Sequence, residues 1–458
     1  ADTHPAGETF ATVRTAVAEP EIEVREDGEI VFDARTAVPI DVSAPDHDVA
    51  PRIRTTVNLY RAPEVGPGAV RGVQAFADGT VFQALPTEPV QRGFFELDSR
   101  WQLADPADPI GTPVLYDVVF PEVGSIPSTL DYVVHPDQLG TSQQQFYAHV
   151  ADSPGQTIQE VRHWWRPWQT GSLGLFEDVA APGLRTDYLA AADTSWTRAL
   201  WFAGPPASSL AARMNAPRME YQPGAEETRT WMRQPVKPGL IEGSPWHPSF
   251  PVVRSGNLLD VLIAGFSDSN RGHWSHQHAS FDQAQFRLYE DGVLVAEADR
   301  PSGDFPLSAQ PSQVRMELDV TRDAPWWTMS TRTSTAWEFG SAPPPTGEPV
   351  AVPMLLVDYD VAVDLLNTGD VPPSVQLQVR HQPGAAGPPV AGVRLWVSYD
   401  DGQTWLERPV RSLGGDRFQS MLPYRGPVGA GFASLRVEAW DTGGNRIEQE
   451  IIRALTTR

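Results

Sequence analysis

Four Asp-Gly dipeptides, each between two runs of alternating apolar and polar residues, constrain the fold of this chain more than any other sequence feature. Tight turns that match the twist of paired strands require positive φ, which Gly and Asp tolerate, so the pattern predicts β-hairpins. We therefore expect an all-β protein built of several antiparallel β-sandwich domains. The dipeptides are Asp27-Gly28, Asp78-Gly79, Asp291-Gly292 and Asp401-Gly402.

Helical periodicity is scarce along the sequence. The 44 prolines and 37 glycines favour loop-rich β architecture over helices. A short helix is expected only at 208–214, where Pro205, Pro206 and Pro217 limit its length.

Two segments divide the chain into expected domains. The segment Ser341–Pro349 reads SAPPPTGEP, and consecutive prolines form a stiff linker that cannot pair within a central strand. The residues after it, 348–458, have the strand count and turn spacing of one immunoglobulin- or fibronectin-like sandwich. A polar, acidic stretch at 221–231 marks a second boundary, which leaves an N-terminal β region at 1–225 (one or two sandwiches) and a middle β-sandwich at 226–343.

The overall composition excludes several classes of partner and chemistry. The formal charge of −23 disfavours nucleic acid and anionic lipid, and no apolar run approaches the roughly 20 residues needed to insert into a membrane. The absence of cysteine excludes disulfides, thiolate metal sites and a cysteine nucleophile. Because the sequence begins at Ala1 without an export signal, we expect any such signal to have been removed or to lie outside it.

The stretch WVSYDDGQTW, at 396–405, matches the Asp-box pattern S-x-D-x-G-x-T-W that recurs on successive blades of sialidase propellers. A propeller requires several blades of similar length, and here the box occurs once. The Asp and Thr oxygens of such a box can bond turn amides while Gly supplies the permissive dihedral. We therefore expect a structural turn and reject a sialidase.

This hairpin and the next one resemble the extreme C-terminal region of large secreted bacterial subtilisin-like (S8 family) serine peptidases. The similarity is carried by VRLWVSYDDGQTWLERPV followed by SLRVEAWDTGGNRIEQEIIRAL. Further segments resemble the same proteins in the same order, at 27–40, 115–139, 286–297 and 318–341.

The peptidase domain of that family has no counterpart here. Its boxes D-[ST]-G, H-G-T-H and G-T-S-x-[AS] would supply the Asp, His and Ser of the catalytic triad. Only two fragments look similar, Gly140-Thr141-Ser142 and Asp441-Thr442-Gly443, and they occur in the wrong order without the histidine box. We expect both to be turns, so no catalytic residue is assigned.

The resemblance therefore implies a non-catalytic accessory region, while a longer precursor would be an S8 serine endopeptidase. Such a region would be secreted. It would bind substrate or a surface, or space and stabilise a covalently linked or associated protease domain that acts on an extracellular polymer or protein. The alternative is a free-standing carbohydrate- or cell-surface-binding β-sandwich protein. A hydrolase with a site between sandwiches ranks third, because no local motif recommends a pair of carboxylates.

Clustered tryptophans are the binding residues expected from sequence, since exposed aromatic rings stack on sugars and peptides. Packing in sandwich cores is the competing interpretation. The candidates are Trp164, Trp165, Arg166, Trp168, Trp246, Trp326 and Trp327.

The stretch 267–282, SDSNRGHWSHQHASFD, contains the candidate metal ligands. Histidines two apart on a strand face the same side, which suits a transition metal such as zinc, and the oxygen ligands suit Ca²⁺. A polar loop with hydrogen-bonded histidines is the competing interpretation, and we favour it. The candidates are Asp268, Asn270, His273, His276 and His278.

Overall fold

The expected all-β fold is confirmed by the structure, a computed structural model. Among the described residues, the only helical segments are two 3₁₀ turns, η1 (Ala34–Thr36) and η2 (Pro136–Gln138). In this part of the chain no helix is long and apolar enough to span a membrane. The described residues are 2–3, 11–23, 27, 29–51, 55–75, 80–108, 110–148, 156–164, 174–203, 210–242, 251–275, 282–324, 327–345, 347–369, 373–423 and 431–457.

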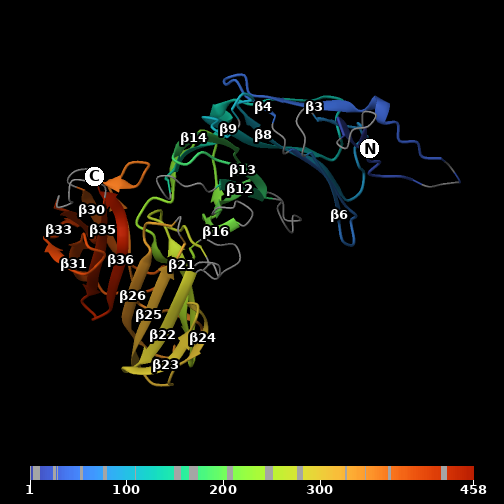
Figure 1. The fold of residues 1–458 in the computed structure, drawn as a ribbon. Helices are drawn as coiled ribbons and strands as arrows, with labels where there is room; N and C mark the ends of the chain where they lie inside the picture. Colours follow the sequence, from blue (N-terminus) through green and yellow to red (C-terminus); the bar gives the residue numbers. More distant parts are fainter. Residues whose placement is uncertain are drawn as a thin grey trace.

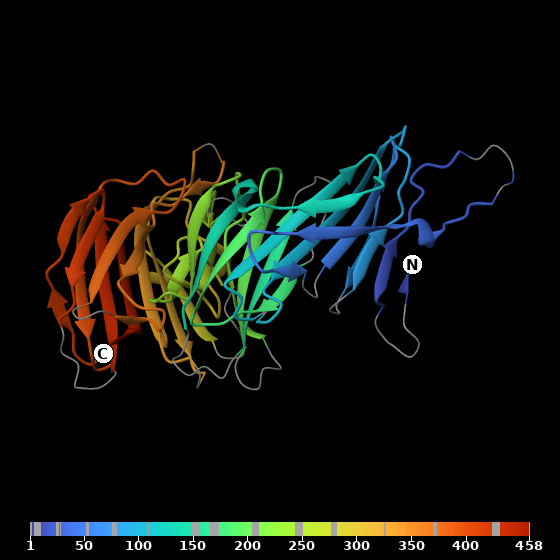
Figure 2. The same ribbon diagram turned by 90° about the horizontal axis from the view of Figure 1, so that it is seen from above.

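The strands form sheets that follow one another along an elongated molecule, with β3 near one end and β33 near the other (Figures 1 and 2). The first sheet has the order β1-β2-β7-β3-β10, and two of its pairs, β2 with β7 and β3 with β10, are parallel. Its strands are β1 (Asp2–Thr3), β2 (Val13–Ala16), β7 (Val81–Ala84), β3 (Val38–Ser43) and β10 (Leu130–Val133).

The second sheet is the largest element of the N-terminal half. It has eight strands in the order β18-β11-β14-β9-β8-β5-β6, with β4 paired to β8. These strands are β18 (Glu226–Trp231), β11 (Leu139–Phe146), β14 (Gly183–Ala190), β9 (Val114–Val123), β8 (Phe94–Ala104), β5 (Thr55–Ala62), β6 (Ala69–Ala75) and β4 (Ala50–Pro51).

The third sheet covers the opposite face of the eight-stranded sheet from the first. Ile40 and Phe82 of the first sheet share a core with Trp101 of β8. Val161 and Trp196 of the third sheet instead pack with residues from the other face. The third sheet has the order β13-β12-β15-β16, with β17 paired to β15, and contains β13 (Leu175–Asp178), β12 (Gln156–Trp164), β15 (Ser195–Ala203), β16 (Leu210–Asn215) and β17 (Met219–Glu220).

A nine-stranded sheet organises the C-terminal half. Its order is β23-β22-β25-β26-β36-β35-β31-β32, with β29 paired to β36. Its strands are β23 (Val293–Ala298), β22 (Asp282–Glu290), β25 (Ser312–Arg322), β26 (Arg332–Ser341), β36 (Arg446–Thr457), β35 (Gly431–Asp441), β31 (Val390–Ser398), β32 (Leu406–Arg408) and β29 (Thr368–Gly369).

Two smaller sheets pack on the inner face of the nine-stranded sheet and share one continuous core with it. The first has the order β19-β21-β20-β27, with β24 paired to β21, and the second has the order β28-β30-β34-β33. Their strands are β19 (Lys237–Leu240), β21 (Leu258–Ser267), β20 (Val252–Ser255), β27 (Val350–Ala351), β24 (Ser302–Pro306), β28 (Leu355–Val361), β30 (Ser374–His381), β34 (Arg417–Met421) and β33 (Arg411–Gly414).

Strand pairing crosses both expected domain boundaries. β18 begins at Glu226, just after the boundary expected at 225, yet it pairs with β11 of the N-terminal half. β26 and β36 lie on opposite sides of the expected linker at 341–349 and pair over seven residues, from Arg332 with Ile452 to Glu338 with Arg446. The prolines therefore lie in the connection from β26 to β27, a strand of a sheet that packs on the nine-stranded one, and β26 and β36 place the middle and C-terminal sandwiches in a shared layer.

The four expected hairpins have different outcomes. The hairpin at Asp291 is confirmed, because Asp291 and Gly292 have φ of 49° and 80° and join paired strands β22 and β23. Asp401 and Gly402 likewise have positive φ between the paired strands β31 and β32. The hairpin at 73–85 is wrong, because β6 pairs with β5 in the second sheet whereas β7 pairs with β2 in the first.

Two further local expectations need correction. Residues 29–33 form no strand, so the hairpin expected around Asp27 is not made by the described residues. The helix expected at 208–214 is also wrong, because residues 210–215 form β16, which pairs with β15. A tertiary partner strand overrides the weak local helical preference at this place.

Candidate functional site

The outer face of the nine-stranded sheet is the candidate functional site. On β25, Val314, Met316 and Leu318 are buried in the core, so the alternate residues Arg315 and Glu317 face outward. The neighbouring strands repeat this alternation, which gives one charged face extending from β22 to β31.

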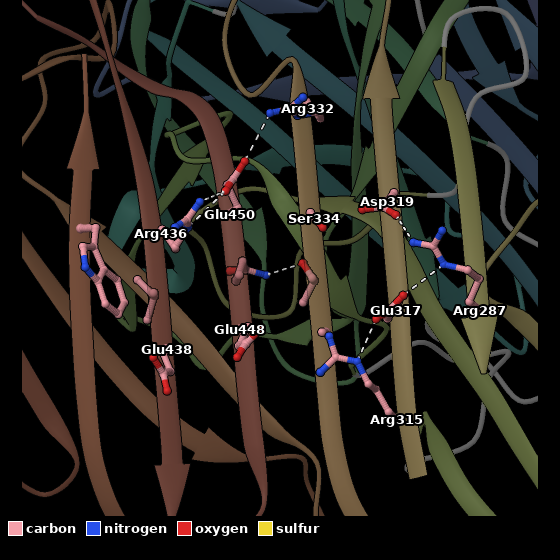
Figure 3. Close-up of a pocket in the computed structure, with 15 residues that line it drawn as sticks. Arg287, Arg315, Glu317, Asp319, Arg332, Ser334, Arg436, Glu438, Glu448 and Glu450 are labelled. Carbon is pink, nitrogen blue, oxygen red and sulfur yellow. Dashed lines mark hydrogen bonds and ion pairs between the residues drawn. The ribbon is translucent and has the colours of Figure 1, made fainter. Parts of the chain in front are cut away.

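A groove runs along β26 in the middle of this face. The register places Ser334 between Glu450 of β36 and Asp319 of β25. In the next row, Ala336 lies between Glu448 and Glu317 in the same way. Because the residues on β26 are short and their neighbours are long, they form the floor of a groove of about 660 Å³ (Figure 3).

The acidic residues that flank the groove are ion-paired. On the β25 side, Arg287 lies 3.1 Å from Glu317 and 2.5 Å from Asp319. On the β36 side, Glu450 lies 2.7 Å from Arg436 and 3.3 Å from Arg332. Figure 3 shows these partners side by side on the same face.

The groove is nearly neutral although the protein is strongly acidic. Four arginines and five acidic residues line it, for a formal charge of −1, against −23 for the whole chain. Its walls consequently offer both carboxylate acceptors and guanidinium donors at short intervals.

An aromatic side chain borders the groove at β31. Trp396 is half-buried and lines the groove, and the Arg394 guanidinium lies 4.7 Å from the centre of its ring. Trp405, which follows the Asp-box turn, lies beneath Arg436 in a similar contact of 4.3 Å. Both tryptophans therefore brace arginines of the charged face.

The Asp-box forms the structural turn that the sequence predicts. Asp400 accepts hydrogen bonds from the Thr404 amide at 2.8 Å and from the Thr404 hydroxyl at 2.5 Å. These bonds, with one from Ser398, lower the pKa of Asp400 to about 2. The turn thus fixes the loop between β31 and β32 close to the charged face.

A buried polar layer, which was not predicted from the sequence, lies between the eight-stranded sheet and the third sheet. Arg100 of β8 and Asp117 of β9 are nearly inaccessible to solvent and form a bidentate pair, with distances of 2.8 and 2.6 Å. Arg100 also donates to the Val161 carbonyl on β12, and Gln102 donates to Asp117. These bonds tie the two sheets together.

The same layer contains a second ionic cluster. Arg185 and Asp187 of β14 pair at 2.6 Å, and Arg185 also contacts Glu177 of β13 at 2.9 Å. Arg198 of β15 lies 3.3 Å from Asp187. An alternation of charged residues along β8 and β14 was the available signal, but such a pattern normally marks a solvated face.

Gly140-Thr141-Ser142 lies within β11, so the expectation of a turn there is wrong. Ser142 is fully buried in the polar layer, where its hydroxyl donates to Glu227 at 2.8 Å and accepts from Arg198. Ser142 also accepts from the Gln144 side-chain amide, and no histidine bonds it within the described part of the chain. The other fragment, at 441–443, does form the turn after β35.

The Asp441 carboxylate has a structural role in that turn. It accepts from the amides of Gly443 and Asn445 and lies 2.9 Å from His381 Nε2 on β30. Although burial alone would raise the pKa of Asp441, these hydrogen bonds lower it. The contact joins the nine-stranded sheet to the sheet that packs on it.

The expected tryptophan surface is described only in part. Trp327 is 2% exposed and packs edge-on against Phe266 at 5.6 Å, so its expected role as a binding surface is corrected to a core role. Trp164 ends β12. The remaining candidates lie outside the described residues and stay predictions: Trp165, Arg166, Trp168, Trp246 and Trp326.

Two of the expected metal ligands contact each other. His273 and Asp268 are buried, with His273 Nδ1 3.1 Å from the Asp268 carboxylate, and the His273 ring packs at a tilt against Trp231, with 4.5 Å between the ring centres. Asp268 also accepts from the Met232 and Asn270 amides. His276 and His278 lie outside the described residues, within which no group of three potential ligands is close enough to hold a metal.

A small cavity beside Asp268 contains a buried lysine. Burial lowers the pKa of Lys237, which lines this space together with Asp358 and Arg380. Its volume of about 20 Å³ accommodates one water molecule. Arg380 pairs with both Asp358 at 2.6 Å and Glu242 at 2.8 Å, so the cluster fastens β28 and β30 to the residues after β19.

Comparisons with known proteins do not assign a family. No protein-family model and no curated protein matches the sequence. Among solved structures, one that is similar is described as a tetra-tandem repeat in the extending region of a large adhesion protein. The match covers 90% of this chain and 92% of the other at 9% identity, with a TM-score of 0.15.

Proposed function

We propose that this chain is a non-catalytic binding region whose groove over β26 holds an extended, neutral, hydroxyl-rich polymer such as a polysaccharide. The observation that carries this proposal is the groove itself, with a floor of Ser334 and Ala336 between two walls of long charged side chains. The groove follows β26 and is open to solvent, so a linear chain can enter it without a free end.

The balance of charges favours a neutral ligand. Each sugar hydroxyl both donates and accepts hydrogen bonds, and the walls alternate acceptors with donors. An anionic polymer would be repelled by the overall charge of −23. A cationic polymer would have to displace arginines such as Arg287 and Arg436 from carboxylates they already contact.

Retention on insoluble polysaccharides, measured by depletion from solution, tests this function. We expect the chain to bind at least one member of a panel of cellulose, chitin and xylan. Ser334→Arg would fill the floor of the groove and should weaken that binding at least tenfold. Binding to no member of the panel would contradict the proposed ligand class.

Ser412→Arg is the matched control, because Ser412 is an exposed strand residue on β33 in a different sheet. It adds the same side chain and charge outside the groove and should leave binding within twofold of the original. Equal losses in both variants would mean that the groove over β26 is not the binding surface.

We further propose that the natural context is the one the resemblance implies, a secreted accessory region of a subtilisin-like serine peptidase. A binding groove would hold the linked protease close to an extracellular polymer and so raise its local concentration at the substrate. The coding sequence upstream of Ala1 tests this context. Three protease boxes there would support it, and their absence would favour the free-standing binder.

A further inference from the structure

Residues 29–33, here called the arm, carry an exposed strand-forming sequence. Ile30, Val31 and Phe32 are 53%, 73% and 50% exposed. β-branched and aromatic residues favour strands, yet the arm has no regular secondary structure. Figures 1 and 2 show the N-terminal chain in this region projecting beyond the sheets. The arm is therefore a strand-forming sequence that has no partner strand among the described residues.

The first sheet has an opening between β3 and β7. These strands pair only at Val38 with Ala84 and Pro39 with Gln83. Beyond that point, within the part of the chain that the structure describes, Ile40–Ser43 pair with β10 alone and Val81 and Phe82 pair with β2 alone. The edge of β3 at Ile40–Ser43 therefore faces the edge of β7 at Val81 and Phe82, and no hydrogen bonds between these edges are described. A groove of about 490 Å³, here called the fork, lies between them.

An aromatic side chain lines the fork. Trp101 lines the fork, is only 4% exposed and packs edge-on against Phe82. An apolar ring therefore forms part of the surface against which an inserted strand would pack.

We propose that the arm of one copy of this chain adds as a strand to the fork of a second copy. An inserted strand would bond both facing edges and place apolar side chains against Phe82, Tyr132 and the ring of Trp101. Such an insertion requires the two edges to be separated by two strand spacings, roughly 9–10 Å.

The arm cannot fill the fork of its own molecule. It leads through η1 directly into Val38, and Val38 and Pro39 are already paired with β7 at the closed end of the fork. If the arm folded back on β3 as a hairpin, it would need the edge of Val38 and Pro39 that β7 already occupies. The partner must therefore come from another copy, and the assembly is an exchange of strands between molecules.

Cysteine cross-linking tests the exchange cleanly, because the natural chain has no cysteine. Val31→Cys in the arm and Ser43→Cys beside the fork are made as separate single variants, mixed and oxidised. We expect a mixed disulfide dimer at least tenfold above that from Val293→Cys mixed with Ser43→Cys. Val293 is the control because it is 65% exposed on β23, far from the fork (Figure 1).

A second measurement keeps the proposal falsifiable if cross-linking perturbs the fork. Phe32→Asp should shift the full chain toward monomer in sedimentation at about 50 µM. Because Phe32 is half exposed, the melting temperature should match that of the original chain at high dilution, where both chains are monomeric. The proposal is overturned if the unmodified chain is monomeric at that concentration. An intramolecular disulfide in a monomeric Val31→Cys/Ser43→Cys double variant would overturn it as well.

Discussion

The buried pair of Arg100 and Asp117 gives the sharpest prediction about what holds the N-terminal half together. Both side chains are at most 1% exposed, and Arg100 makes two hydrogen bonds to Asp117 and one to the Val161 carbonyl. Replacing one partner leaves the other charge buried. Arg100→Met or Asp117→Val alone should therefore lower the free energy of unfolding by about 3–5 kcal/mol.

The double variant Arg100→Met/Asp117→Val should behave differently. It removes both charges and leaves apolar groups of similar volume, an exchange that is often neutral or stabilising. We expect its free energy of unfolding to lie within about 2 kcal/mol of the original, so that the effects of the two substitutions are strongly non-additive.

Urea unfolding followed by circular dichroism measures these differences, and hydrogen exchange of peptides from β8 and β9 assigns them to the correct sheet. Single substitutions that cost under about 1 kcal/mol would refute the argument that the pair is desolvated. A double variant whose cost equals the sum of the singles would show that the two side chains do not interact.

Three further predictions concern pH, turn geometry and the core. Glu227 is mostly buried and would have a raised pKa, but Arg229 and the Tyr221 hydroxyl lower it to about 2. The ionised Glu227 should contribute at most about 3 kcal/mol to the free energy of unfolding above pH 4.5, and this contribution should be lost as the pH falls towards 2. Glu227→Gln should therefore flatten that part of the plot of urea midpoint against pH. Gly402→Ala should lower the free energy of unfolding in urea by about 1 kcal/mol more than Gly292→Ala does. Both glycines have positive φ, but a Cβ at position 402 would lie 2.8 Å from Ile452, whereas a Cβ at position 292 would contact nothing. Trp327→Ala should lower the free energy of unfolding by about 3–5 kcal/mol in the same assay and leave polysaccharide binding unchanged. Weakened binding without a loss of stability would instead place Trp327 in the binding surface.

The sequence predicts the fold class well because turn chemistry and strand periodicity are local. Asp291-Gly292 forms its hairpin because both residues adopt the positive φ that the turn requires. Asp78-Gly79 has the same letters, yet the strands on either side belong to different sheets. Which strand is the partner depends on distant residues, and the dipeptide contains no information about them.

The sites were harder to predict because burial is a tertiary property. The alternating charges of β8 would face solvent if the third sheet did not cover them, and instead Arg100 and Gln102 lie inside a polar layer. Conversely, Trp327 was expected at the surface and lies in the core. The groove residues Ser334 and Ala336 have no distinctive motif, and only the register with Glu450 and Glu317 makes them a floor.

Carboxyl footprinting of the groove tests the central claim most directly. The chain is labelled with a carbodiimide and an amine, with and without a soluble fragment of the polysaccharide that it binds, and labelling is measured by mass spectrometry. We predict that the ligand lowers labelling of Asp319 and Glu448 at least threefold and leaves the exposed Glu297 on β23 unchanged. Equal labelling of Asp319 and Glu448 with and without ligand would contradict binding in the groove over β26.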